Sequence, residues 1–121
     1  MALSRGAHSA VLVDTDPRAA RGNVEALDLG GRATVVRADA CRWLDRAPEG
    51  AFDLVLCDPP YGLDDEIRDR LGRLIPSALG PRGRVVSESA PGRPLELELP
   101  LMRERRYGDT LVRVHAREDA A

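Results

Sequence analysis

Short apolar segments alternate with amphipathic, helix-like segments through the first part of the chain. The apolar segments predict strands at residues 9–14, 33–37 and 52–57. In the third, Leu54 to Cys57 form an uninterrupted apolar run, which is typical of a strand covered on both faces. Capping signals and apolar spacing predict helices at residues 17–29, 41–46 and 64–74, the last extending towards Leu79 despite Pro76. This alternation favours a mostly parallel α/β sheet with helices on both faces.

The last part of the chain has a different pattern, without a further helix. Residues 83–88 predict another buried strand. Beyond it, Leu95, Leu97 and Leu99 alternate with Glu96 and Glu98, which predicts a half-exposed edge strand. Residues 110–115 predict the final strand, after a turn at 107–109, so the last two strands are expected to form an antiparallel hairpin at the sheet edge. The length of 121 residues is that of one domain, spanning residues 1–121.

A short motif, Asp58-Pro59-Pro60-Tyr61, follows the apolar strand at 52–57. Two prolines end the strand and stiffen the turn, which places the motif at the strand's carboxyl end, where open α/β sheets bind ligands. Asp58 and a backbone carbonyl of the turn can accept both hydrogens of an exocyclic amine and aim its lone pair at a methyl donor. Tyr61 offers a flat face for a flipped-out base. The motif therefore predicts an amino-group methylation site, with an ordinary strand-ending turn as the alternative.

Two further carboxylates are predicted at strand ends. Asp14 ends the first strand, and an acidic residue at that place commonly accepts the ribose hydroxyls of a nucleotide cofactor. Asp39 follows the second strand, where it can accept from an adenine amino group. For each, a helix N-cap or a solvated loop acid is the alternative interpretation. Asp16, which precedes Pro17, is interpreted as the N-cap of the first helix.

Composition adds mainly exclusions. The net charge is −2, and all eighteen basic residues are arginine, so the chain has no overall electrostatic signature of nucleic-acid binding. Such a signature must be local. One candidate is a cluster beside Tyr107 that can contact phosphates, although a solvated charged surface is the favoured interpretation. The cluster comprises Arg103, Arg105 and Arg106, and Arg82 and Arg84 can add to it.

No metal site is predicted, because Cys41 and Cys57 lie far apart without metal-ligand spacing. Both are expected to be reduced thiols. The sequence has no signal peptide and no apolar run long enough to cross a membrane. These features predict a cytoplasmic protein that has no membrane partner.

Several segments together resemble the RsmD family of 16S ribosomal RNA guanine-N2 methyltransferases. They are Leu3-Ser4-Arg5-Gly6-Ala7, Val11-Leu12-Val13-Asp14, Val36-Arg37-Ala38-Asp39-Ala40, Asp58-Pro59-Pro60-Tyr61 and Tyr107-Gly108-Asp109-Thr110. The resemblance covers nearly the whole chain and implies a Rossmann-like class I methyltransferase domain. It implies S-adenosylmethionine as cofactor, with Asp14 at its ribose and Asp39 and Ala40 around its adenine. Asp58 would lie beside both the cofactor and the target guanine, and Pro59, Pro60 and Tyr61 would hold the guanine. The partner would be ribosomal RNA or a small-subunit assembly intermediate.

The family also has an amino-terminal strand and a glycine-rich loop that wraps the cofactor, and this sequence has neither. We therefore expect an amino-terminally truncated domain with exposed apolar sheet edges, weak or absent cofactor binding and little activity, unless another chain supplies the missing unit. Two alternatives stay open. The first is an adenine-N6 methyltransferase of DNA or RNA, since Asp-Pro-Pro-Tyr is shared with such enzymes. The second is a non-catalytic remnant that binds RNA or a protein.

Overall fold

The computed structural model describes residues 9–26, 31–57 and 64–117. The chain divides into two compact units, residues 1–43 and 44–121, and each is described by itself. The strands and helices follow one another in the predicted order. That residues 1–121 form one domain stays a prediction. The predicted helix-like start of the chain, residues 1–8, lies outside the described residues.

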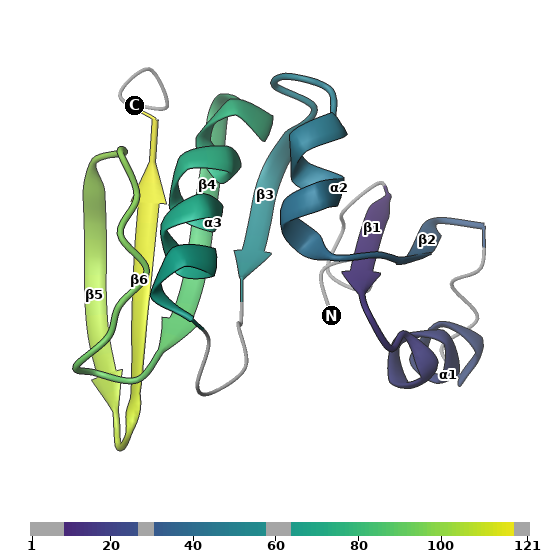
Figure 1. Cartoon of the computed structure of the whole chain (residues 1–121), viewed down its shortest axis with the longest axis horizontal. Helices are drawn as coiled ribbons and strands as arrows, with labels where there is room; N and C mark the ends of the chain where they lie inside the picture. Colours follow the sequence, from purple (N-terminus) through teal and green to yellow (C-terminus); the bar gives the residue numbers. More distant parts are fainter. Residues whose placement is uncertain (1–8, 27–30, 58–63, 118–121) are drawn as a thin grey trace. The chain divides into compact units, whose positions relative to one another are not determined.

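The first unit contains a parallel strand pair and a helix (Figure 1). Strand β1 (Ala10–Asp14) pairs with β2 (Ala33–Arg37), in a register that runs from Ala10 opposite Ala33 to Asp14 opposite Arg37. Helix α1 (Arg18–Ala26) lies between them in sequence. Its buried Val24 packs against one face of the pair, contacting Ala10, Leu12, Ala33 and Val35. Val24 therefore centres the small core of this unit.

The sequence predicts an N-cap at Asp16 and a helix end near Leu29 for α1. Asp16 accepts a long hydrogen bond (3.5 Å) from the main-chain nitrogen of Arg18, the first helical residue, and binds the Arg18 guanidinium at 2.8 and 2.7 Å. Those contacts agree with the predicted capping role. The predicted helix end near Leu29 lies outside the described residues. Helix α2 (Ala40–Arg46) follows β2 and crosses the boundary between the two units.

The second unit is built on a four-stranded sheet in the order β3-β4-β6-β5. Strand β3 (Phe52–Cys57) runs parallel to β4 (Leu79–Ser89), while β6 (Thr110–Ala116) is antiparallel to both β4 and β5 (Leu101–Tyr107). Helix α3 (Asp65–Ala78) connects β3 to β4 and includes Pro76, as predicted. The parallel pairs and the antiparallel hairpin agree with a Rossmann-like methyltransferase fold.

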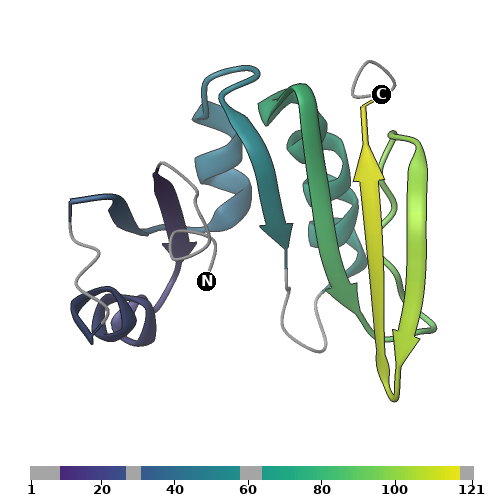
Figure 2. The ribbon, with the colours of Figure 1, turned by 180° about the vertical axis from the view of Figure 1, so that it is seen from behind.

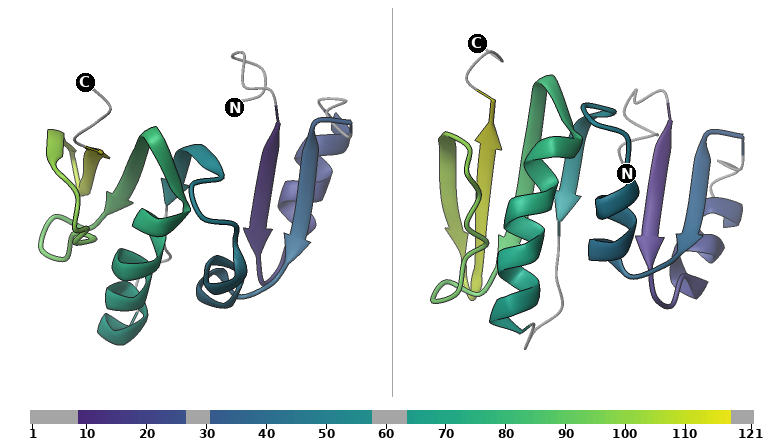
Figure 3. Two further views of the ribbon diagram at one scale, coloured as in Figure 1. Left: turned by 90° about the horizontal axis from the view of Figure 1, so that it is seen from above. Right: turned by 45° about the horizontal axis from the view of Figure 1, so that its top comes forward.

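The four-stranded sheet has two different faces, which Figures 1 and 2 show from opposite sides. One, the helix face, lies under α3, as the view from above in Figure 3 also shows. The buried residues of this face and of α3 form the core of the unit: Leu71, Gly72, Ile75, Ala78, Val85, Ser87, Leu111 and His115. No described element of this unit covers the opposite, open face. The strand register places on it Leu54, Leu56, Arg84, Val86, Glu88, Arg103, Arg105, Tyr107, Thr110, Val112, Val114 and Ala116.

The prediction that residues 95–99 form the edge strand is wrong. In the structure β5 begins at Leu101, and the preceding segment crosses α3 without strand pairing. Leu95 is fully buried, and the main chain at Glu96 passes so close to Gly72 that any side chain there would overlap it. The alternation of Leu and Glu therefore reflects a segment with one face against a helix. That contact produces the same period as a half-buried strand.

The prediction that β3 is covered on both faces is also wrong. Leu54 and Leu56 are 46% and 64% exposed, because both belong to the open face. Among the described residues β3 pairs only with β4, and β1 only with β2, so each strand leaves one edge unpaired. Val11 of β1 is exposed as well. Apolar side chains are thus exposed on both strands, and the expectation that a missing strand leaves apolar edges exposed stays a prediction.

Candidate functional site

The first group of predicted site residues lies at the carboxyl end of the β1–β2 pair. Asp14 is the last residue of β1, and its carbonyl oxygen accepts a hydrogen bond from the Ala38 nitrogen at 3.0 Å. This bond holds the segment after β2 next to the end of β1. Asp39 and Ala40 follow immediately, so the structure brings Asp14, Asp39 and Ala40 to the same end of the pair, as predicted.

Local hydrogen bonds orient both carboxylates. One oxygen of Asp14 accepts from the Asp16 nitrogen at 3.1 Å, which closes a tight turn after β1. One oxygen of Asp39 accepts from the Arg42 nitrogen at 3.1 Å, so Asp39 is the N-cap of α2. For Asp39 the alternative interpretation as a cap is therefore correct. It does not exclude a binding role, because within the described part of the chain the second carboxylate oxygen of each residue has no hydrogen-bond partner.

The second group, Asp58, Pro59, Pro60 and Tyr61, lies outside the described residues. The structure does describe what flanks it. Cys57 ends β3 opposite Ser87 of the parallel strand β4. On the other side Asp64 caps α3, accepting from the Glu66 nitrogen at 2.7 Å. The motif thus belongs to the connection between the carboxyl end of a parallel strand and a helix N-terminus, the place where α/β proteins bind ligands. It lies in the second unit, and Asp14, Asp39 and Ala40 lie in the first.

An ion-pair cluster at the start of α3 was not predicted from the sequence. Asp65 binds the Arg68 side chain at 3.1 Å and also binds Arg93 from the loop after β4. The hydrogen bond and charge of Arg93 hold the pKa of Asp65 below its ordinary value, with a smaller contribution from Arg68. Asp65 and Arg93 are largely exposed, so the ion pair between them adds little stability. Its effect is positional: it fixes the loop after β4 next to the helix that follows the motif.

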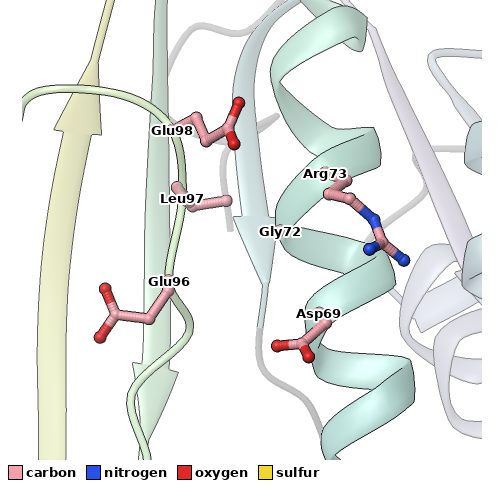
Figure 4. Close-up of a pocket in the computed structure, with 6 residues that line it drawn as sticks. All are labelled: Asp69, Gly72, Arg73, Glu96, Leu97 and Glu98. Atoms are coloured by element: carbon pink, nitrogen blue, oxygen red, sulfur yellow. The ribbon is translucent and has the colours of Figure 1, made fainter.

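An open hollow of about 260 Å³ lies between α3 and the segment before β5 (Figure 4). Half of its lining residues are acidic, and the full set is Asp69, Gly72, Arg73, Glu96, Leu97 and Glu98. It contains none of the predicted site residues, and its carboxylates suit neither a phosphate nor a base-stacking ligand. In the described ranges no group of three or more His, Cys, Asp or Glu side chains is placed to hold a metal ion. None of the described helices is long and apolar enough to cross a membrane.

The arrangement defines a class of protein. Parallel strand–helix units with acidic residues at their carboxyl ends, followed by an antiparallel hairpin, are the fold of a Rossmann-like methyltransferase. A family model described as conserved hypothetical protein 95, which is the RsmD family, matches residues 1–116. The chain belongs to this methyltransferase family, as its sequence segments indicated.

Solved structures agree with this assignment. A conserved hypothetical protein from Streptococcus pyogenes is 30% identical, with a TM-score of 0.80 over 98% of this chain and 78% of its own. A protein of Escherichia coli provisionally named methyltransferase YhhF is 28% identical, with a TM-score of 0.74 over 97% and 67% of the two chains. A provisionally named methyltransferase from Pseudomonas syringae is 25% identical, with a TM-score of 0.70 over 96% and 78%. No curated protein sequence matches the chain significantly.

Proposed function

We propose that this chain is the catalytic part of an enzyme that methylates the exocyclic N2 amine of a guanine in 16S ribosomal RNA. The substrate would be the RNA or a small-subunit assembly intermediate, and the compartment the cytoplasm. The observation that carries the proposal is the position of Asp58-Pro59-Pro60-Tyr61 in an RsmD family member, directly after the last residue of β3. An amine-binding motif at a ligand-binding strand end is what such a reaction requires.

Asp58 has the central role in this chemistry. The guanine amine is a weak nucleophile because its lone pair is conjugated with the ring. A carboxylate that accepts an amine hydrogen, together with a carbonyl of the Pro59-Pro60 turn, favours the geometry in which the lone pair is free to react. Asp58 can then take up the proton that the nitrogen loses, or pass it to water. Tyr61 supports the base by stacking, so catalysis rests on orientation and electrostatic stabilisation.

The residues present also fit the cofactor that the family implies. S-adenosylmethionine, when bound, supplies the methyl group. Asp14 and Asp39 each use one carboxylate oxygen in a local turn or cap and keep the other for a ligand. In the proposal Asp14 accepts the ribose hydroxyls, and Asp39 and Ala40 lie around the adenine. Asp58 borders the cofactor and the guanine.

The test is made in a chain whose amino end carries the strand and glycine-rich loop of a relative. There, Asp58→Ala should lower methyl transfer to 16S ribosomal RNA by at least about 100-fold, since it removes the group that orients the amine. S-adenosylmethionine affinity, measured by calorimetry, should change little. Asp69→Ala is the matched control, because it removes an exposed carboxylate from α3. Equal transfer by the Asp58→Ala variant and the parent chain would remove the central claim.

A further inference from the structure

Three side chains share one side of the edge strand β5. The pairing of Arg103 with Val114, Arg105 with Val112 and Tyr107 with Thr110 places all three on the open face of the sheet. Successive members are two residues apart, about 7 Å along the strand. We call Arg103, Arg105 and Tyr107 the hairpin row. Figure 2 shows the sheet from the side on which this row lies.

The hairpin separates charge between its two sides. On the helix face, Glu104 binds Arg113 at 2.6 Å, so the acidic residue of β5 is neutralised within the protein. Arg106, on the same side, donates to the Gly108 carbonyl oxygen at 2.9 Å. On the open face, the Arg103 and Arg105 side chains form no hydrogen bond or ion pair with any other described residue. Two arginine side chains without a partner among the described residues therefore lie on the open side of β5.

The rest of the open face does not cancel this charge. Among the paired residues of the sheet it carries Arg84, Arg103 and Arg105 against one acid, Glu88. Tyr107, which ends the row, is 58% exposed. Guanidinium groups next to an exposed aromatic ring on a sheet edge suit a ligand that has both phosphates and flat bases. An acidic partner without flat bases would form no stacking contact with the Tyr107 ring.

The register also places the row relative to the end of β3, after which the motif follows in the sequence. Cys57, the last residue of β3, is level with Ser87, Arg113 and Glu104 across the sheet. Arg105 and Tyr107 therefore lie just beyond the level at which β3 ends, and Figure 1 shows the β5–β6 turn at that same end of the sheet. Three strand spacings, about 14 Å, separate β5 from β3. A nucleic-acid strand can cover that span with a few nucleotides.

We infer that the hairpin row is an RNA-binding surface, which holds single-stranded RNA flanking the target base at the catalytic end of the sheet. Arg103 and Arg105 bind phosphates, and Tyr107 stacks on a base. The inference rests on the proposed function and deepens it, because it names where the RNA substrate lies outside the catalytic turn. All three positions of the row are exposed, so its variants should fold normally.

The experiment measures binding of this chain to a fluorescein-labelled single-stranded RNA of about 12 nucleotides, a length typical of one binding surface, without methyl donor. Fluorescence anisotropy is followed between about 50 and 200 mM salt. The double variant Arg103→Gln/Arg105→Gln should weaken binding at least about tenfold at the lower salt and reduce the log–log salt slope by about 1.4, that is about 0.7 per phosphate contact. Tyr107→Ala should weaken binding about fivefold or more, whereas Tyr107→Phe should not.

The matched control is Arg70→Gln/Arg73→Gln, which makes the same change of charge on exposed positions of α3. It should leave RNA affinity unchanged. No binding by the parent chain, an equal loss in both double variants, or an unchanged Tyr107→Ala variant would each overturn the inference. Because the assay needs no methyl transfer, RNA binding that persists in an inactive enzyme would reject the proposed function alone. Methyl transfer without a contribution from the row would reject this inference alone.

Discussion

Replacing Gly72 by alanine should destabilise the protein, although alanine is the better helix former. Gly72 is buried within α3, and a Cβ atom there would overlap the carbonyl oxygen of Glu96. The neighbour is main chain, so it cannot move aside as a flexible side chain can. Either the helix or residues 95–98 must shift, and Leu95, which is fully buried beside this contact, must shift with them.

The expected magnitude is a balance of opposing effects. Alanine in place of a helical glycine stabilises by about 1 kcal/mol. Overpacking a close contact costs about 1–3 kcal/mol, and lifting a buried leucine loses part of the roughly 1.5–3 kcal/mol that its burial supplies. The net change is a loss of about 1–2 kcal/mol, which lowers the melting temperature of a chain of this size by roughly 3–8 °C.

Thermal unfolding followed by circular dichroism measures this change. Gly22→Ala is the control, because Gly22 is also helical, and a Cβ atom there meets nothing within 4 Å. This variant should be stabilised by about 0.5–1 kcal/mol. Opposite signs for the two substitutions would support the close packing of residues 95–98 on α3. A stabilised Gly72→Ala variant would refute it.

Three further changes test other parts of the structure. Asp64→Ala should cost about 1 kcal/mol in urea unfolding, because it removes the N-cap bond to Glu66, and Asp64→Asn should restore most of it; equal losses would argue against the cap. Burial, aided by the Arg113 charge and opposed by Glu96, lowers the pKa of His115 in the folded protein. The His115 side chain therefore binds a proton more readily in the unfolded chain. The free energy of unfolding should fall as pH drops below about 6.5, with a slope of up to about 1.4 kcal/mol per pH unit. His115→Phe should flatten that dependence, and an unchanged slope would exclude His115 as its cause. The exposed apolar strand β3 predicts that the chain self-associates, and Leu56→Glu should reduce this in sedimentation experiments because it adds a charge there; a monomeric parent chain or undiminished association of the variant would contradict the prediction.

Local signals in the sequence predicted most of the elements. The strand at residues 33–37 has the predicted bounds, and α3 extends past Pro76 to Ala78 as the pattern indicated. The bounds of such elements depend on the spacing of apolar residues and on caps and turns, all of which lie within a few residues of one another. Asp39 shows the limit of these signals, because one carboxylate pattern indicates a cap and a ligand site equally well, and the structure shows the cap.

The errors arose where the outcome depended on distant contacts. An alternating segment is half-buried whether its cover is a sheet or a helix, so residues 95–99 could not be told from a strand without knowing that α3 packs against them. The apolar run in β3 indicates a covered strand, yet its exposure depends on whether another element lies on the open face. The pairing of Asp65 with Arg93 likewise joins residues far apart in sequence, and no local pattern indicates it.

Nucleoside analysis of 16S ribosomal RNA gives the most direct test of the proposed activity. The RNA is incubated with S-adenosylmethionine and the chain whose amino end carries the family's strand and loop, then digested and separated by mass spectrometry. The proposal predicts N2-methylguanosine, formed by the parent chain and lost in the Asp58→Ala variant. Formation of N6-methyladenosine instead, or no methylated nucleoside from a protein that binds the cofactor, would contradict it.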